Sequence, residues 1–434
     1  MAAVADITAL AEVRLWGRRV GAVAEQDDRS VVFEYDPEFR RSGIEISPVH
    51  LPLDVSGPVD FPELLRKPAF DGLPGVLADA LPDAFGNRVI RAYFAARGQE
   101  DRALSPVQRL LYVGERALGA LTFHPAEDLP MRPAEEQALE VAALVADARR
   151  IIQGEPGVTV PEIYRVGASA GGMRPKALVL YDPVRGRLRS GFADAEPEDV
   201  PCLLKFDGVG GDTGPEGLGA PQPFNRIEAA YADMARAAGI DMASVEILPG
   251  SEPYAHLLVR RFDLENGRRL HQHTLGGLLH VDYNDIGASS YEEFLRAVLR
   301  LGMPPAAVEE GFRRAVFNIV AVNQDDHVKN LSFHLEPDGA WRLAPAYDVT
   351  FSRGAGWTAT HQMRVADKLS TVTWKDLYGV AKTFGVKRPG RIVEEVRAGV
   401  AQWPDAAATS GVAAEDVELV QAALDARARQ MGVD

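Results

Sequence analysis

The sequence predicts an α+β protein with a β-rich N-terminal subdomain, a second lobe that contains a sheet, and a mostly helical C-terminal lobe. Three observations predict this class. Residues 13–53 alternate apolar and polar side chains as half-buried strands do, residues 165–260 read as strands around one helix, and the remainder has mainly helical spacing. A chain of 434 residues exceeds one typical core, so we expect separate units at 1–126, 127–260 and 261–434.

The N-terminal subdomain is predicted from short strands and helices. Residues 13–16, 20–24 and 31–35 alternate like the strands of a small antiparallel sheet. Helical spacing takes over at residues 61–97, and residues 118–125 read as a strand that closes the subdomain. This closing strand places the first boundary near residue 126.

The second lobe has the strand and loop pattern that a nucleotide-binding lobe needs. The segments 177–181, 201–206 and 255–263 are strand-like, and 224–238 is helical. A glycine-rich loop at 166–176 leads into the first strand, and its backbone amides could approach phosphate oxygens closely. The loop lacks the Gly-Lys-Ser/Thr ending of a Walker A motif, so by itself it fits an ordinary surface turn equally well.

Two residues of this lobe are candidates for contact with phosphate. Lys205 ends an apolar strand, where an ammonium group is unfavourable unless it pairs with an anion such as an ATP phosphate. The alternative is a strand-end lysine whose ammonium group reaches solvent. Ser169 lies in the middle of the glycine-rich loop and is a candidate phosphate acceptor. A further loop, residues 207–221, contains six glycines, and we expect it to be mobile.

The most informative residues of the chain lie in the C-terminal lobe, where Asp325, Asn330 and Asp348 follow one another in order. In protein kinases a catalytic-loop Asp accepts the substrate hydroxyl proton, an Asn five positions later binds magnesium, and a further Asp also binds the metal. Residues 304–322 are predicted to form a helix before Asp325, and residues 331–343 a hairpin that returns Asp348 towards Asn330. The order therefore predicts ATP- and Mg²⁺-dependent phosphoryl transfer on a two-lobed, protein-kinase-like fold.

Other interpretations of these residues remain open. Single Asp and Asn residues often only cap helix ends and turns. His327 could touch a phosphate or orient the acid, or it could be a turn histidine with its hydrogen bonds satisfied. Asp326 stands beside Asp325, so either acid could be the base, although the five-residue step to Asn330 favours Asp325.

Composition excludes several classes of protein. A net charge of -15 and a pI near 5.2 argue against a general binder of nucleic acid or of membrane surfaces, because both are anionic, and leave local basic patches open. The lone Cys202 excludes an intramolecular disulfide. The start of the chain has no basic and apolar signal pattern, and no apolar run reaches membrane-spanning length. We therefore expect a cytoplasmic location.

Taken together, these residues resemble the HipA family of serine/threonine kinase toxins from bacterial toxin–antitoxin modules. The family pattern Asn-x-Asp-x-His-x-Lys-Asn is similar to residues 323–330, the Tyr-Asp metal motif to 347–348, and the Arg-Phe-Asp hinge segment to 261–263. Ser169 lies seven residues before Lys176, where the family has its autophosphorylated serine. Short motifs such as Gly72-Leu73-Pro74 resemble the N-terminal subdomain of full-length members.

The resemblance implies a role for each matching residue. Asp325 would be the catalytic base, with His327 and Lys329 as further catalytic residues, and Asn330 and Asp348 would bind Mg²⁺. The implied ATP-binding residues are Gly171, Gly172, Met173, Arg174, Pro175, Lys176, Lys205, Arg260, Arg261, Phe262, His327, Asn330, Tyr347 and Asp348.

The resemblance also implies a function in growth arrest and persistence. We expect a kinase that phosphorylates a translation component, with an aminoacyl-tRNA synthetase as the family's example, and that autophosphorylates at Ser169. Its implied partner is a HipB-like helix-turn-helix antitoxin. The chain would contact DNA only through this partner, and no membrane partner is expected. Two alternatives remain: a corepressor that acts mainly by binding the antitoxin on operator DNA, and a kinase of small molecules on a related fold.

Overall fold

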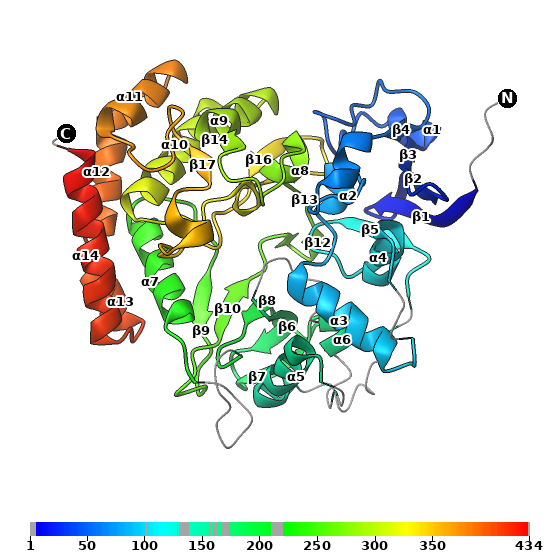
Figure 1. The fold of residues 1–434 in the computed structure, drawn as a ribbon, viewed down its shortest axis with the longest axis horizontal. Helices are drawn as coiled ribbons and strands as arrows, with labels where there is room; N and C mark the ends of the chain where they lie inside the picture. The colour runs from blue at the N-terminus through cyan, green and yellow to red at the C-terminus, as the bar shows by residue number, and fades with distance from the viewer. Residues whose placement is uncertain are drawn as a thin grey trace. The chain divides into compact units, whose positions relative to one another are not determined.

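Figure 1 shows the computed structural model of the chain, which describes residues 6–99, 103–127, 129, 139–155, 158, 163–166, 174–209 and 220–432. The chain forms two compact units. Unit 1 contains residues 1–46, 51–222 and 246–271, and unit 2 contains residues 47–50, 223–245 and 272–434. Helices and sheets both contribute, which confirms the predicted α+β class. The predicted boundaries at residues 126 and 260 stay predictions.

Unit 1 begins with a five-stranded antiparallel sheet in the order β4-β3-β2-β1-β5. Its strands are β1 (Ile7–Leu15), β2 (Arg18–Gln26), β3 (Val31–Tyr35), β4 (Val59–Asp60) and β5 (Leu121–His124). The alternation read from the sequence is confirmed, because Ala11, Val13 and Leu15 of β1 are fully buried. The closing strand is also confirmed, as β5 pairs with β1.

Short helices occupy the stretch between β4 and β5, as the helical spacing predicts. They are η1 (Pro62–Arg66), α2 (Gly75–Ala78), α3 (Ala84–Ala95) and α4 (Pro106–Val113), and α1 (Pro37–Arg40) precedes them. Local hydrogen bonds fix where they begin. The Asp83 carboxylate accepts the Gly86 N–H at 2.7 Å at the start of α3, and Ser105 and Gln108 form a capping box at the start of α4.

A second five-stranded sheet in unit 1 has the order β7-β6-β8-β10-β9. Its strands are β6 (Lys176–Asp182), β7 (Arg187–Ser190), β8 (Val200–Lys205), β9 (Val245–Ile247) and β10 (Leu257–Arg260). Every residue of β6 is buried, and its Ala177, Val179 and Tyr181 share one core with α3, α5 (Val141–Gln153) and α6 (Ile163–Val166). The strands predicted around residues 177–181, 201–206 and 255–263 are confirmed.

Two predictions fall partly outside the described residues. The glycine-rich loop is one, because Ser169, Gly171, Gly172 and Met173 are not described, whereas Arg174, Pro175 and Lys176 are. The second is the loop at 207–221, of which residues 210–219 are not described.

Unit 2 is mostly helical, and α10 (Pro305–Val320) lies in its core. The other helices are α7 (Phe224–Ala237), α8 (Leu275–Leu279), α9 (Tyr291–Arg300), α11 (Trp374–Thr383), α12 (Pro389–Val400), α13 (Trp403–Thr409) and α14 (Ala414–Met431). Helix α10 packs against α9, α12 and α14, and its Phe312, Val316 and Ile319 are fully buried. This is the apolar stripe that the sequence predicts for residues 304–322.

Small sheets of unit 2 flank the loop that follows α10. One contains β13 (His271–Thr274), β15 (Ser332–Leu335) and β16 (Trp341–Leu343), and the other pairs β14 (Ser289–Ser290) with β17 (Met363–Arg364). Strands β15 and β16 form the hairpin predicted between Asn330 and Asp348. A further hairpin, β11 (Leu264–Glu265) and β12 (Arg268–Arg269), belongs to unit 1.

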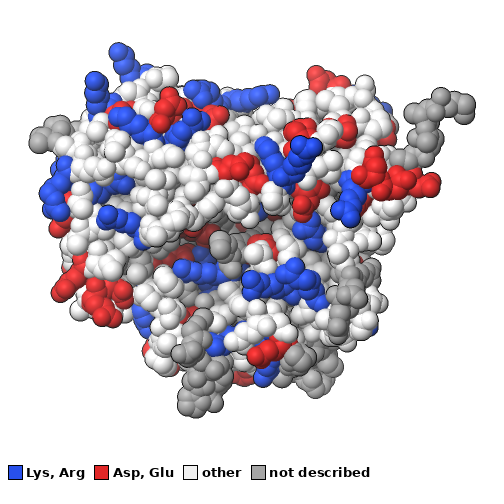
Figure 2. All heavy atoms as spheres, in the orientation of Figure 1, with Lys and Arg blue, Asp and Glu red and all other residues white. Residues whose placement is uncertain are grey.

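Helix length and surface charge follow from the described residues. Among the described residues, no helix combines the length and the apolar character needed to cross a bilayer. Basic and acidic side chains both occur over much of the face drawn in Figure 2, as expected for an acidic chain that still carries 47 Lys and Arg residues.

Candidate active site

The candidate catalytic loop of unit 2 begins where α10 ends. Val322 adopts a φ of 56°, which is unusual for a β-branched residue and marks a sharp turn of the chain. The turn is fixed by Asn323, whose backbone N–H donates to the Asn318 carbonyl and whose Nδ2 donates to the Asn318 side-chain oxygen, both at 3.0 Å. The loop that carries Asp325 therefore leaves the helix in a set direction.

Asp325 combines an accessible carboxylate with defined neighbours. Its side chain is 38% exposed, and its Oδ1 accepts a hydrogen bond from the indole N–H of Trp357 at 2.7 Å. His327 Nε2 lies 3.9 Å from the same oxygen. Asn330, at the end of the short helix η3 (Val328–Asn330), donates from Nδ2 to the Asp325 carbonyl at 3.0 Å. A hydrogen bond thus joins Asn330 to Asp325, the two motif residues that are five positions apart.

Asp326, the neighbouring acid, is built into the core instead. It is 2% exposed. Its carboxylate accepts the Tyr291 hydroxyl at 2.8 Å and the Gln362 backbone N–H at 2.7 Å, and His361 Nδ1 lies 3.0 Å away. A carboxylate surrounded in this way cannot reach a substrate hydroxyl, so the geometry favours Asp325 as the base.

His327 lies among aromatic rings and carboxylates. Its ring centroid is 5.6 Å from that of Tyr283 and 6.3 Å from that of Trp357. Burial lowers the pKa of His327, and the nearby carboxylates of Asp325 and Asp348 offset only part of that effect. The imidazole is therefore neutral at pH 7. Lys329 lies over the face of Tyr283, with Nζ 5.1 Å from the ring centroid.

Tyr347 connects the segment of Asp348 to that of Asn330. Its hydroxyl donates to the Lys329 carbonyl at 2.5 Å and lies 2.5 Å from the Ser332 hydroxyl. Asp348 follows with a φ of 52°, in the left-handed region where Asp occurs more often than most residues. The hairpin and these bonds bring the Tyr-Asp motif back to η3, as the sequence suggests.

The donor set fits magnesium better than a metal held entirely by protein ligands. Asp348 and Asn330 offer one carboxylate and one amide oxygen, and Mg²⁺ typically binds one or two carboxylates, water and substrate phosphates. Among the described residues, no group of three or more His, Cys, Asp and Glu side chains could hold a metal by itself. The assignment of Asn330 and Asp348 as metal ligands stays a prediction.

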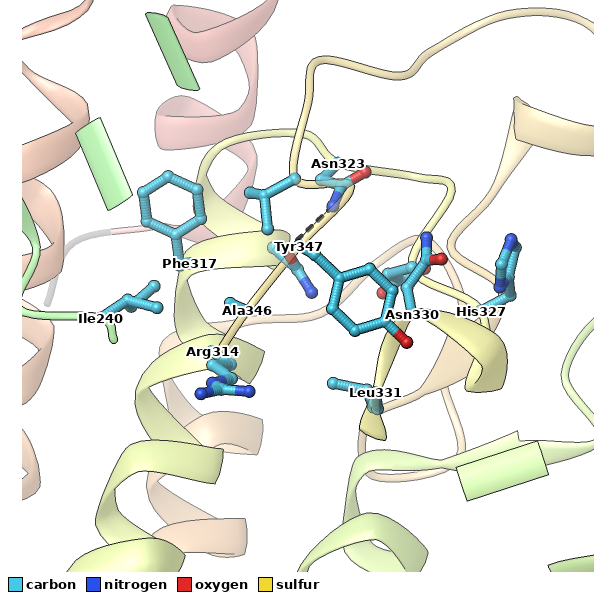
Figure 3. A pocket seen from close by; sticks show the side chains of 12 residues that line it. Ile240, Arg314, Phe317, Asn323, His327, Asn330, Leu331, Ala346 and Tyr347 are labelled. Carbon is cyan, nitrogen blue, oxygen red and sulfur yellow. Dashed lines mark hydrogen bonds between the residues drawn. The ribbon is translucent and has the colours of Figure 1, made fainter. Parts of the chain in front are cut away.

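A small pocket lies beside the loop, as Figure 3 shows. Its volume is about 20 Å³, which holds about one water molecule. Asn323, His327, Asn330 and Tyr347 line it together with Phe317 of α10. Because it is so small, it offers no room for a nucleotide.

The candidate phosphate-binding lysines belong to unit 1. Lys176 of β6 and Lys205 of β8 are directly opposite partners in the antiparallel pair, so both side chains project from the same face of the sheet. Both are buried, with 3% and 7% of their surfaces exposed. Two ammonium groups so placed repel each other unless anionic groups lie near. Their role in phosphate binding stays a prediction.

The residues of the predicted hinge segment, 260–263, differ in burial and in their contacts. Arg260 is exposed at the end of β10, and Phe262 is half-buried. Arg261 donates from Nε and Nη2 to the buried Asp263 at 2.9 and 2.6 Å, and Asp263 also accepts the Gly119 N–H at 2.9 Å. Burial acts to raise the pKa of Asp263, but Arg261 and Gly119 outweigh it and hold that pKa below its usual value. The Arg261 side chain is thus engaged in structure.

The sequence reasoning missed several residues that the structure joins to the site. Trp357 and Gln362 lie far along the chain from Asp325, and Tyr291 and His361 reach Asp326 from other elements. None of them carries a periodic or motif signal. The Trp-rich character of residues 341–374 is the one hint that the printed sequence offers.

Comparison with known proteins shows which family and fold the chain resembles. Residues 168–403 match the family described as "HipA-like C-terminal domain", and residues 11–124 match "HipA N-terminal domain". No curated protein matches. A solved HipA structure, from the Shewanella oneidensis MR-1 complex of HipA, HipB and operator DNA, has a TM-score of 0.65 at 18% identity. The match covers 96% of this chain and 95% of that chain, so the two share the fold.

The first of these family matches spans more than half of the chain, and the second covers most of its N-terminal part. The resemblance that the motifs suggest is therefore confirmed, and with it the HipA-like fold. The chain belongs to the HipA family.

Proposed function

We propose that this chain is an ATP-dependent serine/threonine protein kinase that acts as the toxin of a toxin–antitoxin module. One observation carries the proposal: an accessible acid, an amide five residues later and a second acid converge through two hydrogen-bonded connections. Asn330 donates to the backbone of Asp325, and Tyr347 bonds the segment of Asp348 to that of Asn330. This order is the one used for phosphoryl transfer by protein kinases.

Each residue has a distinct task in the proposed reaction. Asp325 accepts the proton of the substrate hydroxyl as the hydroxyl oxygen attacks the γ-phosphorus of ATP. The bond between that phosphorus and the bridging oxygen breaks, and ADP leaves. Asn330 and Asp348 supply the oxygen ligands for Mg²⁺. When bound, Mg²⁺ neutralises charge that develops on the phosphates. Lys176 and Lys205 contribute positive charge for the phosphates, and His327, kept neutral by burial, can donate or accept a hydrogen bond beside Asp325.

The test is transfer of labelled γ-phosphate from Mg²⁺-ATP to proteins of a bacterial extract. Wild type is expected to transfer phosphate, and Asp325→Ala and Asp348→Ala to lose transfer. Asp338→Ala is the matched control, because Asp338 is an exposed acid in the turn of the same hairpin and bonds only locally to Ala340. Undiminished transfer by both site variants would contradict the proposal. Labelling of a metabolite and of no protein would favour the small-molecule kinase.

Autophosphorylation at Ser169 is part of the proposal. A phosphate there adds about two negative charges to a loop that has to receive ATP phosphates, so it lowers ATP affinity by repulsion. Intact-mass measurement after incubation with ATP is expected to find one added phosphate, lost in Ser169→Ala. Phosphate found only elsewhere would contradict the regulatory assignment.

We further propose that a helix-turn-helix antitoxin of the HipB kind restrains this chain and connects it to DNA. The solved neighbour is a complex of HipA with HipB and operator DNA, which supports a partner of this type. A chain with a net charge of -15 is expected to meet DNA through a basic partner. Co-purification with the product of an adjacent short helix-turn-helix reading frame tests this. Repression by Asp325→Ala together with that partner would show that the corepressor role is separate from catalysis.

The proposed substrate is a component of translation, with an aminoacyl-tRNA synthetase as the candidate that family membership suggests. Phosphoproteomics after induction of wild type and of Asp325→Ala identifies it. The expected result is one protein with new phosphoserine or phosphothreonine in the wild-type sample alone, and growth arrest that depends on Asp325.

A further inference from the structure

We infer that Trp357 is a positioning residue that orients the Asp325 carboxylate, and that a loop anchored on Asp326 holds it there. This inference deepens the proposed function and rests on it. It assigns separate tasks to the two adjacent acids: Asp325 faces the acceptor hydroxyl, and Asp326 anchors the loop whose tryptophan returns to Asp325.

The first observation is the contact itself. The indole N–H of Trp357 donates to Asp325 Oδ1 at 2.7 Å, a short distance for a hydrogen bond to a carboxylate. No described residue donates a hydrogen bond to Oδ2 of the same side chain. A carboxylate can rotate about its last bond, and one strong donor on Oδ1 fixes that rotation. We therefore assign Oδ2 to the acceptor hydroxyl.

The second observation is that Trp357 lies on a loop held at both ends by the catalytic loop. At the first end, the Gln324 N–H donates to the Ser352 carbonyl at 2.9 Å, and the Ser352 N–H donates to the Val322 carbonyl at 3.1 Å. At the other end, the Gln362 N–H donates to Asp326 Oδ1 at 2.7 Å. We call residues 353–361, between these two attachments, the Trp357 loop.

The side chain of Gln362 stabilises the Trp357 loop from within. Its Nε2 lies within hydrogen-bonding distance of the carbonyls of Gln324 at 3.2 Å, Trp357 at 2.6 Å and Thr360 at 3.1 Å. The Gly354 N–H also donates to the Thr358 carbonyl at 3.1 Å. Although residues 353–356 are exposed, the backbone of Trp357 is thus attached to the same loop that carries Asp325.

These contacts form a closed circuit. Asp325 is followed in sequence by Asp326, which accepts a hydrogen bond from the Gln362 backbone N–H. The Gln362 side chain donates to the Trp357 carbonyl, and the Trp357 indole donates back to Asp325. This closed set of hydrogen bonds between protein groups fixes the orientation of the Asp325 carboxylate. A general base has to be held in productive geometry, and small misplacements reduce the rate of the chemical step.

The matched experiment compares Trp357→Phe with Trp374→Phe in the full chain. Both changes remove an indole N–H and keep an aromatic ring, and Trp374 donates to the Gly432 carbonyl at 3.2 Å, away from the acids. In the γ-phosphate transfer assay on extract proteins, Trp357→Phe is expected to lower kcat about tenfold or more with KM for ATP unchanged. Trp374→Phe is expected to leave both constants unchanged.

The outcomes separate this inference from the proposed function. An inactive wild type contradicts the proposed function. An active wild type with an unchanged Trp357→Phe contradicts the positioning role, and so does a higher kcat, which would mean that the indole obstructs Asp325. A rise in KM for ATP with kcat unchanged would also overturn it, because the residue would then act on nucleotide binding.

A spectroscopic measurement tests the contact without relying on activity. The chain has five tryptophans, so a sample with ¹⁵N-labelled indoles gives five N–H signals, and Trp357→Phe identifies one of them. Asp325→Ala is expected to shift that signal and leave the Trp374 signal in place. An unmoved Trp357 signal would show that the hydrogen bond is absent in solution and would overturn the inference.

Discussion

Asp263 in unit 1 and Asp326 in unit 2 are buried carboxylates that connect distant parts of their units by different chemistry. Asp263 accepts two hydrogen bonds from the Arg261 guanidinium and one from the Gly119 N–H. Asp326 is surrounded by the Tyr291 hydroxyl, the Gln362 N–H and the His361 ring. The guanidinium of Arg261 bonds Asp263 directly, so removal of Asp263 leaves a buried charge without its partner. The groups that contact Asp326 directly are a hydroxyl, a backbone N–H and an imidazole, so its removal is expected to cost less.

The comparison of the two buried acids also shows which nearby residue is available for catalysis. Arg261, two residues before Asp263, uses its guanidinium in the ion pair with Asp263 and is not available for a ligand. Next to Asp326 stands Asp325, which keeps a third of its surface in solvent. A buried acid that depends on local polar donors can thus fix the backbone of a loop while the adjacent residue remains available for a substrate.

The largest expected effect separates Asp325 from Asp326. Asp325→Asn is expected to lower kcat for phosphate transfer by about 10²- to 10⁴-fold, because it removes a general base. Its free energy of unfolding is expected to stay close to that of wild type, because the side chain is partly exposed. Transfer kinetics and denaturant unfolding on the same samples check both parts. A strongly destabilised but active Asp325→Asn would reverse the roles assigned to the two acids.

Asp263→Ala is expected to give the largest loss of stability. It leaves the Arg261 guanidinium buried without its countercharge, which costs about 3–5 kcal/mol. The midpoint of urea unfolding measures this loss. The double variant Asp263→Ala/Arg261→Met is the control, and it is expected to recover a large part of the stability. If the double variant is no more stable than the single one, the ion pair is not the cause.

Asp326→Asn is expected to have a smaller effect on stability, about 1–3 kcal/mol, because the amide presents an N–H group where the donors need an acceptor. Tyr291→Phe removes the hydroxyl that donates to Asp326 and that accepts the Asn318 Nδ2 hydrogen at 2.8 Å, and it should cost about 1–3 kcal/mol. Urea unfolding ranks the two variants against Asp263→Ala. A cost for Asp326→Asn equal to that of Asp263→Ala would erase the distinction between the two acids.

The smallest expected effect is a dependence on pH. Because the pKa of Asp263 is lower in the folded chain than its unfolded value of about 4, its stabilising contribution is complete above that value. The contribution is lost as the pH falls below about 4 towards the folded pKa. Unfolding free energies of wild type and Asp263→Asn should therefore converge as the pH falls from 5 to 3. Parallel curves over that range would contradict the assignment.

Local patterns predicted much of the fold. The stripe of Phe312, Val316 and Ile319 predicts α10, and alternation predicts the strands around Val13, because helical and strand periodicities act within a few residues. The hairpin before Asp348 follows from a polar turn between two apolar runs. These elements depend on neighbours in the sequence, so a single chain is enough to identify them.

The parts that could not be predicted depend on residues far apart in the chain. No pattern places Lys176 opposite Lys205, because strand register is decided by the whole sheet. Asp325 and Asp326 are chemically alike, and only their partners in other elements show which one is buried. The contact of Trp357 with Asp325 has no local signature, since it depends on a loop closed by Gln362.

One feature of α14 bears on the synthesis of the protein. Arg427 Nη2 lies 3.3 Å from His361 Nε2, and the other nitrogen of that ring contacts Asp326. The buried network beneath the proposed base therefore stays incomplete until the ribosome has made residue 427 and the helix has docked. A nascent chain that stops earlier lacks this support, so the order of translation itself delays assembly of the complete site in a protein proposed to attack translation.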